Sequence, residues 1–283
     1  MATLFTNILI PVDFSENTDV AVQKAIELIV PVNSIVHLLH VTRQGIQFNG
    51  CHLNGHFMSP PISNTLYNEE AEINLELCKK NIQASFPFIN VITHIATGGN
   101  IQERIIEMVN KLNVQLIIIG KTKSRKWFSF FNTVDTSLIA KKTNSGVLTI
   151  KNGSLPGRIR SIVLPVRSFV PDKKIELLSA VTQKHKPIIH LVTTHNKAVN
   201  KTRAFLDTYR TISDYMHYPI QYKMLEGDNF PKAIFDYARF TMADMILVNP
   251  YEETRINSIY GRDICDLISP TSNLTVLKTE PSH

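Results

Sequence analysis

The sequence predicts an α/β protein built from two tandem copies of one unit, each a doubly wound parallel sheet. Short, wholly apolar segments alternate with helical patterns, and this alternation is typical of parallel sheets with right-handed crossovers and helices on both faces. The segment NILIPVD at residues 7–13 returns as SIVLPVR at residues 161–167. The turn GGNI at residues 98–101 returns as GDNF at residues 227–230, and a helical run and an apolar strand follow each. We therefore treat the chain as a duplication.

The first copy shows a complete series of strands and helices. Its strands are apolar on both faces, and its helices carry apolar residues at helical spacing. In chain order, the predicted elements are strand 8–12, helix 18–29, strand 36–41, helix 69–84, strand 91–96, helix 102–112, strand 116–119, helix 136–142 and strand 147–151. The expected buried stripes are Ile105, Ile106 and Val109 in helix 102–112, and Ile73, Leu77 and Ile82 in helix 69–84.

The spacing of the repeat places an insertion in the first copy. The first strands lie 154 residues apart, whereas later matching positions lie 129 apart, so the first copy holds 25 extra residues. We assign them to a segment of about residues 42–67, which is rich in Gly, Pro, Asn and His and has no apolar period. A loop of this length is more often functional or mobile than a plain connector. The predicted domains are residues 1–152, with this long loop, and residues 158–283.

Composition excludes several classes of protein. The net charge of +6 suggests nucleic acid as a partner, but the basic residues form no long stripe, so nucleic-acid binding is not expected. The three cysteines, Cys51, Cys78 and Cys265, have unrelated spacings and are expected to be free thiols. Cys51, His52 and His56 do not make a convincing zinc set, so no metal is expected. Because we find neither a membrane span nor a signal sequence, we expect a cytoplasmic protein without membrane contact.

Several segments resemble the universal stress protein family. They are the opening NILIPVDFS at residues 7–15, His40 and Val41 after the second strand, the turn at residues 98–100, and IIIG at residues 117–120 with its basic loop and the final VLTI. The resemblance covers nearly the whole chain as two copies, and the first copy is the closer one. It implies an adenine nucleotide alpha hydrolase-like fold, with a five-stranded parallel sheet in each copy. It also implies a pseudo-two-fold pair, like the homodimer of single-domain members.

The first copy offers one candidate binding crevice. Ligands of open parallel sheets bind beyond the carboxyl ends of the strands, where the strand order reverses, which groups Asp13, Val41 and Gly120. By resemblance, Asp13 accepts a hydrogen bond from an adenine or its ribose. The alternative is that Asp13 only begins a turn or caps the next helix. The resemblance supplies apolar walls at Pro11, Val12 and Val41.

The phosphate motif of the family is altered in this copy. Its nucleotide-binding branch has Gly, two residues, Gly, nine residues, and Gly followed by Ser or Thr, so that backbone amides approach phosphate oxygens. Here Gly120 keeps the first position, whereas Lys123, Thr133 and Val134 occupy the others. A one-residue slip would still offer the Thr133 hydroxyl. The basic loop after Gly120 is either a side-chain phosphate site or a solvated surface.

The second copy has lost more of the motif. Arg167 stands in place of the aspartate and Asn249 in place of the first glycine. Glu252 and Glu253 bring negative charge to the loop where a phosphate would bind. We therefore expect no ATP in the second copy.

These observations favour a non-enzymatic stress-response or regulatory protein whose first domain binds ATP or another adenine nucleotide. The alternative is an interaction module with both glycine motifs degenerate, in which the long loop and nearby aromatic residues face an unidentified protein partner. A slow ATP hydrolase ranks last, because no catalytic base or metal carboxylate can be assigned. The expected associations are pairing of the two domains within the chain and a possible homodimer.

Overall fold

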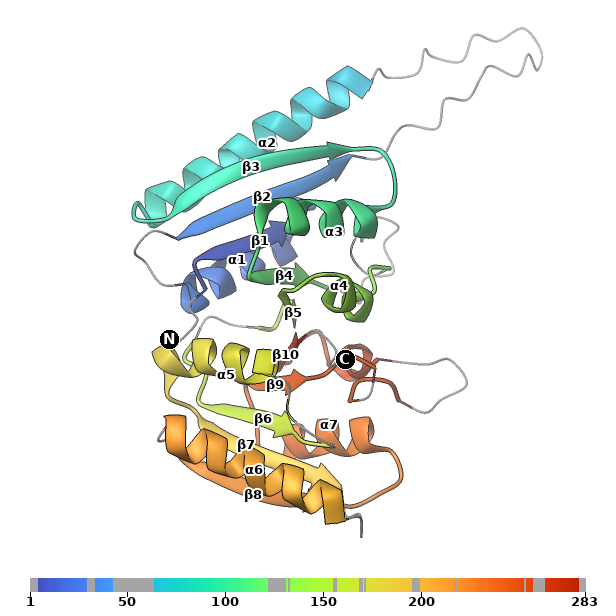
Figure 1. The fold of residues 1–283 in the computed structure, drawn as a ribbon. Helices are drawn as coiled ribbons and strands as arrows, with labels where there is room; N and C mark the ends of the chain where they lie inside the picture. The colour runs from blue at the N-terminus through green and yellow to red at the C-terminus, as the bar shows by residue number, and fades with distance from the viewer. Residues whose placement is uncertain are drawn as a thin grey trace, which may run out of the picture.

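Ten strands form one continuous sheet, in the order β3-β2-β1-β4-β5-β10-β9-β6-β7-β8 (Figure 1). This computed structural model describes residues 5–29, 34–42, 64–121, 131, 133–154, 157–167, 170, 172–194, 199–216, 218–251, 253–256 and 263–279. We call β1 to β5 with their helices the first half and β6 to β10 with theirs the second half. The strand order of the second half mirrors that of the first, which confirms the predicted α/β fold and the pseudo-two-fold pair.

The elements alternate as the sequence predicts. The first half contains β1 (Asn7–Pro11), α1 (Glu16–Leu28), β2 (Ile35–Thr42), α2 (Asn64–Ser85), β3 (Asn90–Thr97), α3 (Ile101–Leu112), β4 (Leu116–Gly120), α4 (Thr136–Lys142) and β5 (Gly146–Ile150). The second half contains β6 (Ser161–Pro165), α5 (Asp172–His185), β7 (Ile188–Thr194), α6 (Val199–Met216), β8 (Ile220–Leu225), α7 (Phe230–Phe240), β9 (Met245–Val248), α8 (Ile264–Leu267) and β10 (Thr275–Lys278). The predicted division between residues 152 and 158 falls between β5 and β6 and stays a prediction.

Apolar side chains form one layer on each face of the sheet. On one face, residues of α1, α2, α5 and α6 belong to a single core that runs through both halves. On the other face, α3 and α4 cover the first half, and α7 and α8 cover the second. The sheet is therefore buried on both sides, as the apolar strands predict.

The two halves meet where β5 pairs with β10, the one antiparallel pair among the described strands. Every other pairing is parallel, from β1 with β2 to β7 with β8. The carboxyl-terminal ends of α1 and α5 also touch across this junction. Lys184 Nζ donates to the carbonyls of Ile26 (3.0 Å) and Ile29 (3.2 Å), which satisfies acceptors that a helix end leaves open.

The repeated Gly-x-Asn turns have a structural explanation. Gly98 and Gly99 adopt positive φ angles of 67° and 79°, and Gly227 adopts 111°, which is the region that favours glycine. Asn100 then caps α3 by accepting a backbone N–H two residues on (2.9 Å), and Asn229 caps α7 in a similar way (3.1 Å). The repeat therefore marks the entry to a helix in each half.

The predicted buried face of α2 was partly wrong. Ile73 and Leu77 are 68% and 55% exposed, whereas Ala71, Leu75 and Ile82 are buried. The buried residues follow the helical period along the side that lies over the sheet, and Ile73 and Leu77 lie on the other side of the helix. The stripe predicted for α3 is confirmed, since Ile105 and Val109 are buried and Ile106 packs against the same core.

The insertion of the first half lies between β2 and α2. β2 ends at Thr42 and α2 begins at Asn64, whereas in the second half only four residues separate β7 from α6. The two ends of the predicted loop, about residues 42–67, thus belong to β2 and α2. Residues 43–63 lie outside the described part of the chain.

Candidate functional site

Each half has a switch point at which the strand order reverses, between β1 and β4 and between β6 and β9. We call the spaces beyond the carboxyl ends of these strands the first and the second crevice. In the first half, Leu9 pairs with Ile117, so the same register places Val12 level with Gly120. Pro11 pairs with Leu39, so the register of β1 and β2 places Asp13 level with Val41. Asp13, Val41 and Gly120 thus lie at the carboxyl ends of neighbouring strands, and their contact with a ligand stays a prediction.

Asp13 lies at the mouth of the first crevice and is half-buried. Its Oδ1 accepts hydrogen bonds from Ser15 N (3.2 Å), Ser15 Oγ (2.5 Å) and Thr18 Oγ1 (3.3 Å). This is the turn-forming role that the sequence allowed as an alternative, because Ser15 in turn caps α1. Among the described residues, nothing donates to Oδ2, so this oxygen remains available to a ligand.

The wall beside Asp13 includes an aromatic pair that sequence reasoning missed. His40 Nδ1 donates to the Val12 carbonyl (2.8 Å), and the ring centroids of His40 and Phe14 lie 4.7 Å apart. Phe14 has a φ of 57° and is 36% exposed. The strained backbone of a bulky residue after a strand holds this ring at the surface. The walls that were predicted are more enclosed: Pro11, Val12 and Val41 are all buried.

Gly120 is required by helix packing. A Cβ atom at this position would lie 2.7 Å from Asn17 Cβ and 2.9 Å from the Asn17 carbonyl oxygen, so a side chain would push α1 away from β4. Asn17 is itself buried, and its Oδ1 has no hydrogen-bond partner. The first turn of α1 therefore holds a buried acceptor, enclosed by the packing of α1 against β4.

Those of the predicted phosphate-binding residues that the structure describes do not form a glycine-type cradle. Val134 is 3% exposed and packs in the apolar core, so its side chain offers nothing to an anion. Thr133 is exposed, and Lys121 Nζ donates to the Val134 carbonyl (2.7 Å), which holds the returning chain. Lys123 lies outside the described residues.

A carboxylate already occupies the amino-terminal end of α4. Asp135 Oδ1 accepts hydrogen bonds from the backbone N–H groups of Ser137 (2.8 Å) and Leu138 (3.1 Å). These are the donors that a phosphate would use at a helix start. The negative charge of Asp135 at this place disfavours a second anion.

The second crevice is filled by a buried ion pair. Lys174 Nζ, on α5, donates to Glu253 Oε2 (2.8 Å) and to the carbonyl of Pro165 at the end of β6 (2.7 Å). Glu253 Oε2 also accepts the backbone N–H of Asn249, just after β9 (2.7 Å). Both side chains are buried, at 0% and 1% exposure. The pair thus ties together the two strand ends between which a ligand would enter.

The ion pair of Lys174 and Glu253 gives a structural reason for expecting no nucleotide in the second copy. The sequence placed Glu253 in a loop and gave no sign that it is buried against a lysine. Arg167, at the position of Asp13, is exposed, and Glu252 lies outside the described residues.

The described part of the chain was also searched for metal sites and membrane-spanning helices. Across the described ranges, no cluster of three or more His, Cys, Asp or Glu side chains is placed to hold an ion. His37 and His40 of β2 do not point toward a common metal position. The ring of His37 faces His94, with 2.9 Å between ring nitrogens, whereas the ring of His40 faces the Val12 carbonyl. Cys78 and Cys265 are free thiols, and Cys51 is not among the described residues. A search of the described helices for one that could span a bilayer found none.

Comparisons with known proteins agree with this fold. Residues 4–143 match the sequence model of the universal stress protein family. No curated protein matches the chain in sequence. A universal stress protein from Archaeoglobus fulgidus has a TM-score of 0.64 at 14% identity, with 99% of this chain and 98% of that one covered.

Two further solved structures share the fold over nearly their whole length. A protein from Pseudomonas aeruginosa described as a universal stress protein has a TM-score of 0.55 at 17% identity, covering 98% of this chain and 94% of its own. The cytoplasmic domain of a prokaryotic cation chloride cotransporter has a TM-score of 0.51 at 13% identity, covering 98% and 95%. The family model covers the first half, which therefore belongs to the universal stress protein family, and the solved structures show that the same fold extends across the entire sheet.

Proposed function

We propose that this protein is a cytoplasmic, non-enzymatic stress-response regulator whose first crevice binds an adenine nucleotide mainly through its nucleoside end. The observation that carries the proposal is Asp13 Oδ2, an acceptor at the mouth of the first crevice to which no described residue donates. This oxygen calls for a ligand that offers donors. The ribose hydroxyls and the exocyclic amine of adenine are donors of this kind.

The phosphate end of such a ligand would gain little. Val134 is buried and Asp135 caps α4, so the described part of the crevice presents no free backbone cradle. We therefore expect ATP, ADP and AMP to bind with affinities within about ten-fold of each other, because the described residues supply no cradle for the charge-assisted hydrogen bonds that would distinguish the three nucleotides.

Calorimetric titration with ATP, AMP and adenosine tests this proposal. Asp13→Asn is the informative variant, because its amide oxygen still accepts the turn hydrogen bonds while its amino group replaces the Oδ2 acceptor. We expect a loss of about ten-fold or more in affinity for all three ligands, which corresponds to the removal of one hydrogen bond to a charged group. Arg167→Ala, at the matching position of the second half, is the control and should bind normally.

A second candidate function is an interaction module without a nucleotide, in line with the capped α4 and the buried Val134. Absence of binding for every nucleotide up to millimolar concentration, in protein free of co-purified nucleotide, would put this second candidate first. In that case the search would turn to protein partners.

A further inference from the structure

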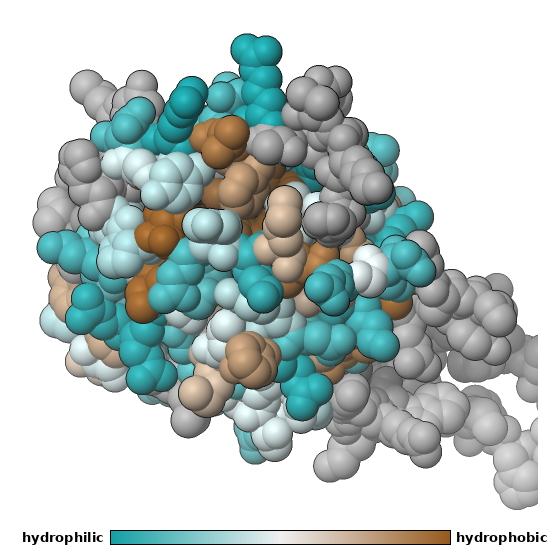
Figure 2. Space-filling view, turned by 90° about the horizontal axis from the view of Figure 1, so that it is seen from below, coloured by the Kyte–Doolittle hydropathy of each residue, from teal (hydrophilic) through white to brown (hydrophobic). Residues whose placement is uncertain are grey.

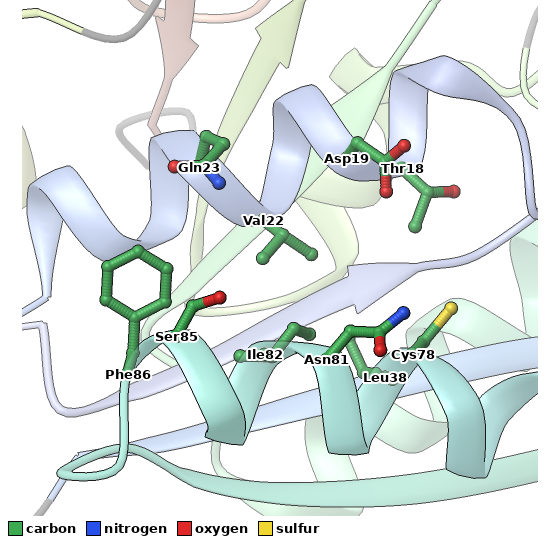
Figure 3. A pocket seen from close by; sticks show the side chains of 10 residues that line it. All are labelled: Thr18, Asp19, Val22, Gln23, Leu38, Cys78, Asn81, Ile82, Ser85 and Phe86. Atoms are coloured by element: carbon green, nitrogen blue, oxygen red, sulfur yellow. The ribbon is translucent and has the colours of Figure 1, made fainter.

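A separate pocket lies between α1 and α2, on the face of the sheet that carries these helices (Figure 3). Its volume is about 200 Å³. An apolar cavity of about 150 Å³ accepts benzene, so this pocket has room for a ring with a short chain. It is smaller than the usual site for a drug-sized ligand, which points to a small molecule.

The floor of the pocket is apolar and firmly placed. Val22 from α1, Leu38 from β2 and Ile82 from α2 line it, and their exposed fractions are 8%, 0% and 7%. All three belong to the core shared by both halves. The floor is therefore set by core packing and needs no rearrangement to receive an apolar group.

The two ends of the pocket differ in chemistry, as Figure 3 shows. Asp19 lies at one end with Cys78 nearby, and Phe86 lies at the opposite end. Asp19 is the one lining side chain that is charged at neutral pH, and no lysine, arginine or histidine lines the pocket. Burial, and then the charge of Asp19, raise the pKa of the Cys78 thiol, so Cys78 stays neutral there.

We propose that this pocket binds a small organic cation, with its ammonium group beside Asp19 and its apolar body over Val22, Leu38 and Ile82. The charge of the site selects the ammonium, because Asp19 has no ion-pair partner among the described residues. The floor and the Phe86 ring select a body of aromatic or branched aliphatic character. Thr18 lines this pocket and also donates to Asp13 at the first crevice, but the proposal does not depend on nucleotide binding.

The test uses the full-length protein and three probes of one size: 2-phenylethylamine, the neutral 2-phenylethanol and the anionic phenylacetate. Methyl-resolved NMR reports on Val22, Leu38 and Ile82 directly. We expect saturable shifts of the methyl groups of these three residues, with the amine binding more tightly than the alcohol and phenylacetate binding least.

Two variants separate charge from shape. Asp19→Asn should weaken binding of the amine about three- to five-fold, as expected for a partly exposed ion pair, and leave the alcohol unchanged. Ile82→Trp should fill the pocket and abolish binding of both, whereas Ile73→Trp, on the exposed side of α2, should have no effect.

The proposal is overturned if phenylacetate binds as tightly as the amine, or if Asp19→Asn leaves the affinity for the amine unchanged. It is also overturned if the shifts fall on methyl groups outside the pocket. Should Ile82→Trp fail to fold, the comparison of the three probes on the wild type and on Asp19→Asn still decides the question.

Discussion

At the scale of single residues, the histidine pair on β2 and β3 links the fold to pH. His37 is 4% exposed, and its Nδ1 lies 2.9 Å from His94 Nε2, so one ring donates a hydrogen bond to the other. Burial, and then the charge of His94, lower the pKa of His37 from 6.5 to about 4. Burial, and then the charge of Lys111, lower the pKa of His94 as well. The folded state therefore favours the neutral rings.

A loss of stability in acid follows from this pair. Because the pKa of His37 is lower in the folded state than in the unfolded state, its contribution to the free energy of unfolding is complete above pH 6.5 and is lost as the pH falls toward 4. We expect His37 to account for a decrease of about 1–2 kcal/mol between pH 7 and pH 5. Urea unfolding at several pH values measures it. His37→Gln should show a shallower decrease, and an unchanged slope in that variant would contradict the argument.

At the scale of elements, α2 shows that an apolar pattern can predict a helix without predicting which of its faces is buried. The helix holds two candidate apolar stripes, and the exposed fractions of Leu75 (1%) and Leu77 (55%) tell which one faces the sheet. Leu75→Ala should lower the free energy of unfolding by about 2–4 kcal/mol through loss of burial and the cavity that remains. Leu77→Ala is the matched control, with an expected effect of less than about 0.5 kcal/mol. Equal effects in thermal or urea unfolding would show that the helix is turned differently.

Much of the fold could be predicted because its signals are local. Strands buried on both faces are apolar throughout, and the buried stripe of α3 has no competitor in its own sequence. The face of α2 could not be predicted, because Ile73 and Leu77 match the helical period as well as Leu75 and Ile82 do.

The candidate site could be predicted only in part. The position of Asp13 follows from the end of a strand. In contrast, Lys174 and Glu253 lie 79 residues apart in the chain, and the sequence around neither residue predicts that they form an ion pair. Similarly, the packing of Gly120 against Asn17 depends on how closely α1 approaches β4.

At the scale of the whole molecule, a buried lysine joins the two halves beside the β5–β10 pair. Lys278 Nζ, on β10, donates to Thr136 Oγ1 (2.9 Å) and Ser137 Oγ (2.9 Å) of α4 and to Asp263 Oδ2 (2.8 Å), which caps α8. Burial raises the pKa of Asp263, but the charge and hydrogen bond of Lys278 outweigh it and lower that pKa. One ammonium group therefore connects helices of both halves.

Removal of this ammonium should weaken the whole molecule. Lys278→Met leaves the Asp263 carboxylate without its cation in a largely buried place, so we expect a loss of about 2–4 kcal/mol in the free energy of unfolding. Lys173→Met is the control, because Lys173 pairs with Glu176 on the surface of α5, and its loss should cost less than about 0.5 kcal/mol. Thermal unfolding followed by circular dichroism distinguishes the two. A loss as small as that of the control would show that the Lys278 contacts contribute little.

Seen from the β8 end of the sheet, the surface shows hydrophobic side chains interspersed with hydrophilic ones (Figure 2). Tyr222 and Met224 of β8 and Leu206 of α6 are exposed. β8 forms one edge of the sheet, at the opposite end of the strand order from β3.

The ion pair in the second crevice has a consequence for stoichiometry. A homodimer of identical subunits presents two equal crevices, so it passes through half-occupied states and its ligand response can be cooperative. In this chain one crevice is closed by its own Lys174 and Glu253, and covalent linkage fixes the ratio of open to closed crevices at one to one. A ligand of the first crevice would therefore bind to the monomer with a simple hyperbolic isotherm and a Hill coefficient of one, and the bound fraction would rise with ligand concentration without a threshold.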